Sequence, residues 1–288
     1  MNPPEIELLR DRPLVRRLAE RLSFASALIE VAGELALGYF ARVGTLTVQT
    51  KGAQDMATEA DLAVEALIRE RIETHFPNDG MLGEETGYRG PVDPEGVWVV
   101  DPIDGTQPFV SGIPTWCISI AFVQGEEVMF GLVNNPGSGE LFIGAKWLPA
   151  TLNGNLIHPR SVPSIADGLT YLGASTRVGP DKIVPVLDRL LRAGGMFVRG
   201  GSGALGLCDV ACGRLVGYVE AHINSWDCLG AVAILEAAGC RVNRFLEGDA
   251  LLEGNLIVAG PPAVYDELVA ILGSPNPNLP SHSSTPAT

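Results

Sequence analysis

An acidic turn at the end of an apolar run is the segment of this sequence with the clearest chemistry. The run Val97–Val100 predicts a buried β-strand, and the next residues read Asp101-Pro-Ile-Asp104. The proline disfavours helical backbone conformations for Asp101 and favours a turn at this point. One aspartate is enough for such a turn, whereas two carboxylates three residues apart can together hold a hard cation. The segment is therefore either an ordinary Asp-Pro turn or part of a metal site.

The residues next to these aspartates are suited to metal ions and phosphate. The carbonyl of Ile103 and the hydroxyl of Thr106 are further oxygen ligands of the kind that hard cations prefer. A carboxylate at Asp101 could bridge two metal ions, as in two-metal sites that transfer phosphoryl groups. Gly105 and Thr106 could begin a helix whose free N–H groups hold a phosphate oxygen, and Pro108 suits its first turn.

Three further acidic clusters each have a structural explanation when taken alone. Gly83–Gly87 (GEETG) is typical of an exposed acidic turn. Thr58–Asp61 (TEAD) before an apolar run is typical of a helix capping box. Ser225–Asp227 (SWD) places an acid in a first helical turn, where the helix dipole favours it by about 0.3–1 kcal/mol. Only the order of these clusters along the chain gives them a common interpretation.

That order resembles the inositol monophosphatase family, which consists of Mg²⁺-dependent, lithium-sensitive phosphomonoesterases. The sequence DPIDGT, with Trp98 three residues before its first aspartate, is highly specific for this family. The remaining motifs follow in the family's order: Lys51-Gly, Asp55, Thr58, Asp61, Gly83-Glu-Glu, Leu152-Asn-Gly and Trp226-Asp. The resemblance covers about residues 14–272. It implies a layered αβαβα sugar-phosphatase fold of mixed α and β class, usually as a homodimer.

The resemblance also implies a role for each motif residue. The metal ligands would be Glu84, Asp101, Ile103 through its carbonyl, Asp104 and Asp227. The residues that orient the attacking water and help to deprotonate it would be Asp61 and Thr106. The substrate-binding residues would be Gly105 and Thr106 through backbone N–H groups, Ser202, Gly203 and Glu220. Two or three Mg²⁺ ions are the implied cofactor. Lys51 lies where the family has a basic residue, although a solvated lysine is an equally good interpretation.

The implied reaction is hydrolysis of a small polyol phosphate, such as inositol-1-phosphate, by metal-activated water. The stretch Phe109–Trp116 (FVSGIPTW) instead resembles histidinol-phosphate phosphatases, whereas Glu220–Asp227 (EAHINSWD) looks more like inositol and sugar-alcohol phosphatases. Gln107-Pro108 lacks the charges typical of 3′(2′),5′-bisphosphate nucleotidases, so nucleotides rank third. A non-catalytic binding protein of the same fold would have lost a metal-binding acid, and none is lost here.

Alternating helical and extended patterns must position these residues. We expect helices over 13–41, 58–76, 182–193, 204–212, 226–238 and 263–272. We expect strands over 45–49, 97–100, 117–123, 128–134, 140–145, 169–174, 197–199, 216–220 and 256–259, with a loop over 51–57. The expected organisation is a loose arm over 1–12, a phosphatase domain over 13–273 and a disordered tail over 274–288. The domain's N-terminal metal-binding half would span about 13–160 and its C-terminal half about 161–273.

Composition narrows the partners and the compartment. The 288 residues carry a net charge of −14, which opposes electrostatic attraction to nucleic acid or an anionic membrane. An anionic phosphate ester therefore needs a local cation, and a bound metal ion is the simplest one. Glu30 and Glu34 interrupt the apolar stretch Phe24–Phe40, so we expect no membrane-spanning helix, and the first residues do not form a signal peptide.

The five cysteines favour a reduced, cytoplasmic protein. Their number is odd, their spacing matches no zinc motif, and each lies among apolar residues. We interpret all five as packing residues: Cys117, Cys208, Cys212, Cys228 and Cys240. The expected partner is a small phosphate monoester, with no nucleic acid and no membrane, and a second copy of the chain.

Overall fold

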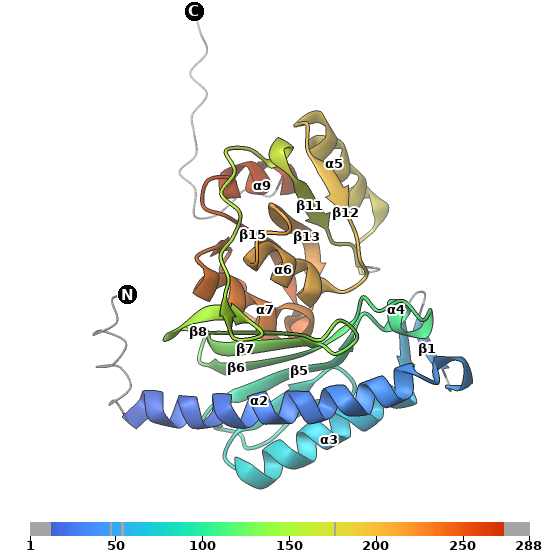
Figure 1. Ribbon diagram of the computed structural model, residues 1–288, viewed down its shortest axis with the longest axis vertical. Helices are drawn as coiled ribbons and strands as arrows, with labels where there is room; N and C mark the ends of the chain where they lie inside the picture. Colours follow the sequence, from blue (N-terminus) through green and yellow to red (C-terminus); the bar gives the residue numbers. More distant parts are fainter. Residues whose placement is uncertain (1–12, 47, 53–54, 176, 274–288) are drawn as a thin grey trace, which may run out of the picture.

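Two long helices cover one face of a large β-sheet in the computed structural model of the chain (Figure 1), which describes residues 13–46, 48–52, 55–175 and 177–273. These outer helices are α2 (Pro13–Phe40) and α3 (Glu59–His75). A middle layer of α6 (Gly203–Ala211) and α7 (Ser225–Ala238) separates this sheet from a second one. The far face of the second sheet carries α5 (Pro180–Arg192) and α9 (Tyr265–Leu272). The five layers confirm the predicted αβαβα arrangement.

The larger sheet has eight strands in the order β10-β9-β8-β7-β6-β5-β3-β4. Only β3 and β5 pair in parallel; the other neighbours within it are antiparallel. The bounds are β3 Gly80–Gly83, β4 Gly87–Arg89, β5 Val97–Asp104, β6 Cys117–Gln124, β7 Glu127–Asn135, β8 Glu140–Ala145, β9 Leu148–Leu152 and β10 Asn155–Leu156. β5 lies inside the sheet, and its pairing with β6 shifts register between Asp101 and Asp104.

The second sheet has five strands in the order β12-β11-β13-β15-β14. The bounds are β11 Leu169–Leu172, β12 Met196–Val198, β13 Gly217–Ile223, β14 Arg241–Val242 and β15 Asn255–Gly260. A separate antiparallel hairpin consists of β1 (Val48–Gly52) and β2 (Asp55–Thr58). The short helices are η1 Val43–Thr45, α4 Thr106–Val110, η2 Ile165–Asp167 and α8 Ala250–Glu253.

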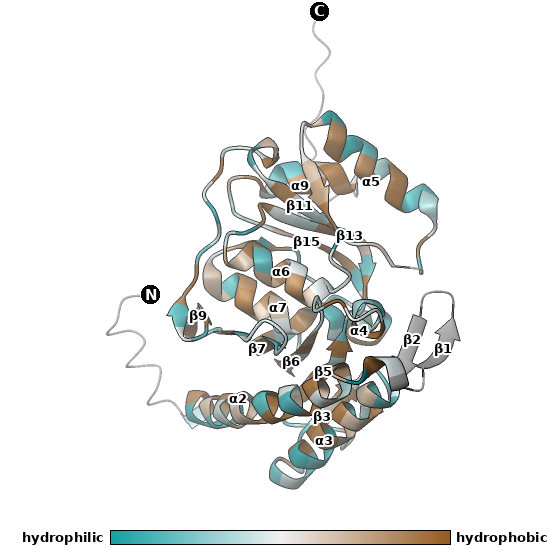
Figure 2. Ribbon diagram, turned by 45° about the vertical axis from the view of Figure 1, so that its right-hand side comes forward, coloured by the Kyte–Doolittle hydropathy of each residue, from teal (hydrophilic) through white to brown (hydrophobic). Residues whose placement is uncertain are grey.

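Layer position explains the composition of the helices. α7 is apolar around its whole circumference, because it lies between two sheets and buries ten of its fourteen residues. Figure 2 shows this apolar middle layer, with α2 and α3 more mixed on the outside. By length and composition alone α2 is long and apolar enough to cross a membrane, a property that it shares with core helices of soluble proteins. In the structure, Leu18, Ala25 and Ile29 of α2 are buried in the core beneath the large sheet.

The sequence predicted most helices and strands but misplaced the region before α3. The strand expected over 45–49 starts too early, because residues 43–45 form a 3₁₀ turn and β1 begins at Val48 and runs on to Gly52. The loop expected over 51–57 is wrong as well, because an isolated hairpin forms there. Two short strands with no apolar run give little signal in sequence. The predicted arm over 1–12 and tail over 274–288 lie outside the described residues, and the division into two halves stays a prediction.

Candidate active site

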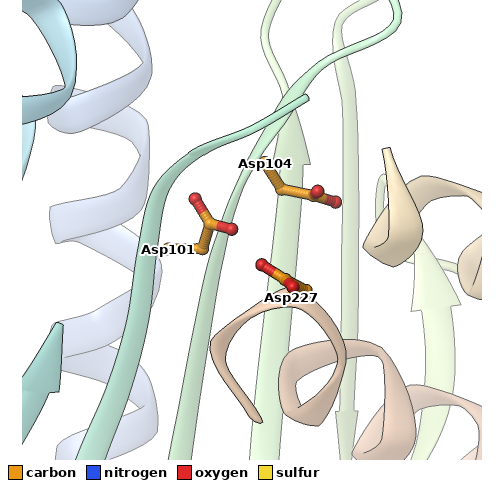
Figure 3. A group of neighbouring side chains, drawn as sticks. All are labelled: Asp101, Asp104 and Asp227. Carbon is orange, nitrogen blue, oxygen red and sulfur yellow. The ribbon is translucent and has the colours of Figure 1, made fainter. Parts of the chain in front are cut away.

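Three aspartates from distant parts of the chain point toward one another (Figure 3). Asp101 and Asp104 come from the end of β5, and Asp227 comes from the first turn of α7. One carboxylate oxygen of each lies within 4.8 Å of the others. Asp101 and Asp104 are buried, and Asp227 is half-buried. A buried set of carboxylate oxygens at this separation fits a hard divalent cation such as Mg²⁺ and no soft metal.

The bulge at the end of β5 determines how the first two aspartates are presented. Regular pairing with β6 holds as far as Asp101, and the register then shifts before Asp104. The backbone N–H of Ile103 donates to Asp101 Oδ1 at 3.0 Å and so fixes the bulge. Because strand side chains alternate between faces, this irregularity is what allows side chains three residues apart to converge.

Asp227 has a structural role and a position in the cluster at the same time. Its Oδ2 accepts from the backbone N–H of Asn224 at 3.3 Å and from Asn224 Nδ2 at 3.0 Å, which completes a capping box at the start of α7. The structural interpretation of the Ser225–Asp227 motif is therefore correct. The same capping bonds also hold the carboxylate facing Asp101 and Asp104.

Asp104 is held by the first residues of α6. Ser202 Oγ donates to Asp104 Oδ2 at 2.5 Å, Ala204 N donates to the same oxygen at 2.7 Å, and Gly203 N donates to Oδ1 at 3.2 Å. Ser202 is only 1% exposed, and it also caps α6 by accepting from Leu205 N at 3.1 Å. The structure thus turns the Ser202 side chain toward Asp104, and its predicted contact with substrate stays untested. A serine before an apolar helix was the signal for the cap.

Asp61 and Thr106 meet although they are 45 residues apart. Thr106 Oγ1 lies 3.4 Å from Asp61 Oδ1 and 3.2 Å from the Ile103 carbonyl oxygen. Asp61 Oδ2 accepts from the backbone N–H and hydroxyl of Thr58 at 2.8 and 2.6 Å, so the predicted capping box is present. The cap uses Oδ2, and Oδ1 faces Thr106 beside the aspartate cluster.

Gly105 makes the turn between β5 and α4. Its φ is +97°, and a Cβ at this position would lie 2.9 Å from the Thr115 carbonyl oxygen. Both observations require glycine here. The helix that follows begins at Thr106, as predicted, but has only five residues.

Two of the clustered aspartates, Asp104 and Asp227, line a cavity of about 780 Å³. Glu84, which follows β3, lines this cavity together with Asp104, Thr106 and Asp227.

Glu220 lines the cavity too, but it does not end its strand as expected, because β13 continues to Ile223. The pairing of β13 with β15 shifts register after Glu220 and resumes at Ile223. Such a shift leaves no pattern in the sequence, so the strand could be predicted only as far as Glu220. The Tyr218 hydroxyl donates to Glu220 Oε2 at 2.5 Å.

Comparison with known proteins assigns this arrangement. A model of the inositol monophosphatase family matches residues 17–274. The chain belongs to the inositol monophosphatase family. It is an enzyme of the phosphoric monoester hydrolase class, as the resemblance implied.

Two curated relatives and one solved structure show the extent of the similarity. The chain is 36% identical to a Synechocystis protein named inositol-1-monophosphatase, covering 85% of this chain and 88% of the relative. It is 32% identical to a Chlorobaculum parvum protein named histidinol-phosphatase, covering 88% of this chain and 96% of the relative. It matches the solved inositol monophosphatase from Anabaena with a TM-score of 0.76 and 31% identity, over 89% of this chain and 96% of that one. The sugar-phosphatase fold is thereby confirmed.

Burial raises the pKa values of the three clustered aspartates in this phosphatase. Burial raises the pKa of Asp101 well above its usual range, and the nearby charges of Glu84, Asp104 and Asp227 raise it further. Burial and the Asp227 charge raise the pKa of Asp104 to about 7, although bonds from Ser202, Ala204 and Gly203 oppose the shift. These raised pKa values favour protonated carboxyl groups in the cluster when no cation is bound. A divalent cation would displace these protons.

One cysteine has more polar surroundings than the sequence indicated. All five cysteines are unbridged, as expected. Cys117 at the start of β6 is buried, however, with its Sγ 3.7 Å from Asp104 Oδ2 and 3.5 Å from Ser202 Oγ. Cys117 therefore lies beside Asp104 and beside Ser202, which holds Asp104. The sequence shows that Cys117 follows the Gly105 turn, but it does not show that the fold brings Cys117 next to Ser202.

Proposed function

We propose that this phosphatase is Mg²⁺-dependent and hydrolyses a small polyol phosphate such as inositol-1-phosphate. The observation that carries the proposal is the convergence of Asp101, Asp104 and Asp227 within 4.8 Å, beside the contact between Asp61 and Thr106. Carboxylates alone would repel a phosphate monoester. Their clustering is therefore understandable if they hold cations that attract it.

The proposed metal ligands are Glu84, Asp101, Asp104, Asp227 and the carbonyl of Ile103. Asp101 is the most central of them, because the charges of Glu84, Asp104 and Asp227 all raise its pKa. When bound, two or three Mg²⁺ ions neutralise phosphate charge, lower the pKa of water and stabilise the leaving alkoxide. The number of ions remains part of the proposal.

Asp61 and Thr106 would orient the attacking water. In the structure the Thr106 hydroxyl is within reach of Asp61 Oδ1 and can donate to it. The Thr106 oxygen then has a lone pair free to accept a hydrogen from water, which leaves a water lone pair facing phosphorus. Asp61 keeps the hydroxyl in this orientation and favours proton transfer away from the water. Backbone N–H groups of Gly105 and Thr106 are the proposed contacts to phosphate oxygens.

Residues on the far side of the cavity are the proposed contacts to the alcohol part of the substrate. Glu220, 6% exposed, is the proposed acceptor for substrate hydroxyls, and Gly203 contributes to the same wall. Burial raises the pKa of Asp227 and raises that of Glu220 to about 8, and the charges of Arg177 and Arg199, which also line the cavity, partly oppose these two shifts, respectively. Two arginines disfavour an ammonium group in the leaving alcohol, so they favour a polyol phosphate over histidinol phosphate.

Histidinol phosphate stays the second candidate, because the segment Phe109–Trp116 resembles that branch and one relative bears the name histidinol-phosphatase. A bisphosphate nucleotide ranks third. Lithium sensitivity, a homodimer, a cytoplasmic location and the absence of nucleic-acid or membrane partners complete the proposal. A non-catalytic role is disfavoured, since every expected metal-binding acid is present.

A substrate panel tests the proposal. Purified protein would be assayed with Mg²⁺ for phosphate release from inositol-1-phosphate, histidinol phosphate, fructose-1,6-bisphosphate and adenosine-3′,5′-bisphosphate. We expect the highest kcat/KM with inositol-1-phosphate and no turnover in the presence of a chelator. Metal-independent release, or a preference for histidinol phosphate, would overturn the corresponding part of the proposal.

A further inference from the structure

A buried glutamate outside the proposed metal site holds the loop that carries Glu84. Glu65 lies on α3 and is 1% exposed. Its Oε2 accepts from the backbone N–H of Glu85 at 2.8 Å. Its Oε1 accepts from the backbone N–H and the hydroxyl of Thr86 at 3.2 and 2.5 Å. Both residues that follow Glu84 are thus bonded to this one carboxylate.

The residue before Glu84 is packed against the same group. A Cβ on Gly83 would overlap the Glu65 carboxylate, so only glycine allows the strand end to approach so closely. The backbone N–H of Glu84 itself donates to the Val100 carbonyl oxygen at 3.2 Å, which continues the pairing of β3 with β5. The backbone on each side of Glu84 is therefore held between the sheet and Glu65.

An arginine completes the support from the same helix. Arg69 Nη2 donates to Glu65 Oε1 at 3.2 Å, to Thr86 Oγ1 at 2.6 Å and to the Gly87 carbonyl oxygen at 3.2 Å. Its charge compensates the buried carboxylate of Glu65. Groups held in this way by several bonds have little freedom, and the loop inherits that rigidity.

The helix also explains why this support matters for the site. Asp61 and Glu65 are four residues apart on α3, so they lie on the same face of the helix. α3 thus presents Asp61 to Thr106 and Glu65 to the Glu84 loop. We propose that Glu65, assisted by Arg69, is a positioning residue that fixes Glu84 for cation binding; this inference rests on the proposed role of Glu84 as a metal ligand.

A double-mutant cycle tests the proposal through Mg²⁺ binding measured by titration calorimetry, without any need for turnover. Glu65→Gln keeps the shape but puts an N–H₂ group opposite donors, so the loop loses part of its support. We expect the Mg²⁺ dissociation constant to rise about tenfold in Glu65→Gln relative to the native protein. Glu70→Gln is the matched control, an exposed glutamate on the same helix, and should bind Mg²⁺ as the native protein does.

The second arm repeats the change in a Glu84→Gln protein. If Glu65 acts through Glu84, adding Glu65→Gln there should change Mg²⁺ affinity by less than about twofold, because coupled residues are not additive. The same tenfold loss in both backgrounds would overturn the proposal. If Glu84→Gln alone leaves Mg²⁺ affinity unchanged, the proposed metal role of Glu84 fails instead.

A milder variant covers the case in which Glu65→Gln does not fold. Thr86→Val removes one hydroxyl bond to Glu65 and one from Arg69 but keeps both backbone bonds. We expect a two- to threefold rise in the Mg²⁺ dissociation constant that again disappears in the Glu84→Gln background. An unchanged affinity in this folded variant would contradict the proposal.

Discussion

The two walls of the cavity are built differently. The wall from the first half of the chain, formed by Glu84 and residues 104–107, is backed by buried acids with fixed hydrogen-bond partners at the end of β5 and the start of α3. The opposite wall, from β13 and the segment before α5, combines Glu220 with the exposed arginines Arg177 and Arg199. The first wall carries acids that could hold cations, and the second combines one buried carboxyl group with two guanidinium groups. We infer that the first determines the reaction and the second determines the substrate.

The largest effect should come from the first wall. Asp101→Asn removes the charge at the centre of the cluster, so turnover should fall at least ~10³-fold, about 4 kcal/mol in the barrier. Hydrolysis of p-nitrophenyl phosphate at saturating Mg²⁺ measures this effect. Asp93→Asn, an exposed aspartate before β5, is the control and should retain full activity. Near-native turnover in folded Asp101→Asn would mean that the segment Asp101–Asp104 only forms a turn and takes no part in catalysis.

A smaller loss on the same wall should separate water orientation from cation binding. Thr106→Ala removes the hydroxyl that faces Asp61, so we expect kcat to fall roughly 10²-fold, within the range for positioned proton transfer. The Mg²⁺ dissociation constant should change by less than about twofold, in contrast to Asp101→Asn. Thr74→Ala, whose hydroxyl bonds only within α3, is the control. Unchanged turnover would remove Thr106 from the mechanism, and a matching loss of Mg²⁺ affinity would make it a ligand.

The second wall should give the smallest and most substrate-dependent effect. Glu220→Gln can still accept a hydrogen bond from a hydroxyl but cannot pair with a cation. We expect a loss of less than about tenfold in kcat/KM for inositol-1-phosphate, below the roughly 1.5–3 kcal/mol of a full charged hydrogen bond. With histidinol phosphate the loss should be larger and lie mainly in KM. An equal loss with p-nitrophenyl phosphate, which offers neither group, would place Glu220 in support of the fold or the cations.

The walls also differ in how far the sequence predicted them. The acids of the first wall, and Asp227 that faces them from α7, lie in short local motifs. Each motif encodes its own geometry: a capping box at Asp61 and at Asp227, and a strand end at Asp101. Local patterns of this kind can be read from sequence. The layered fold followed from the resemblance of these motifs to a family.

Contacts between distant segments could not be predicted in the same way. Nothing local indicates that Ser202 bonds Asp104, 98 residues away, or that Glu65 holds the loop after β3. In the sequence Glu65 is one of several acids in the helical segment 58–76, and its burial depends on the distant segments that pack over it. The hairpin before α3 was missed for the opposite reason, since its polar residues resemble a loop.

The central claim is that the aspartate cluster binds Mg²⁺ in competition with protons. Because the pKa of Asp104 is raised to about 7 and that of Asp101 is raised as well, binding must displace protons at lower pH. Calorimetric titration of Mg²⁺ into metal-free protein between pH 5.5 and 8.5, roughly 1.5 units on each side of pH 7, tests this directly. We predict that affinity rises at least about tenfold per pH unit below pH 7, levels off above it, and is lost in Asp101→Asn. Binding that is independent of pH, or equal in Asp101→Asn, would contradict the account.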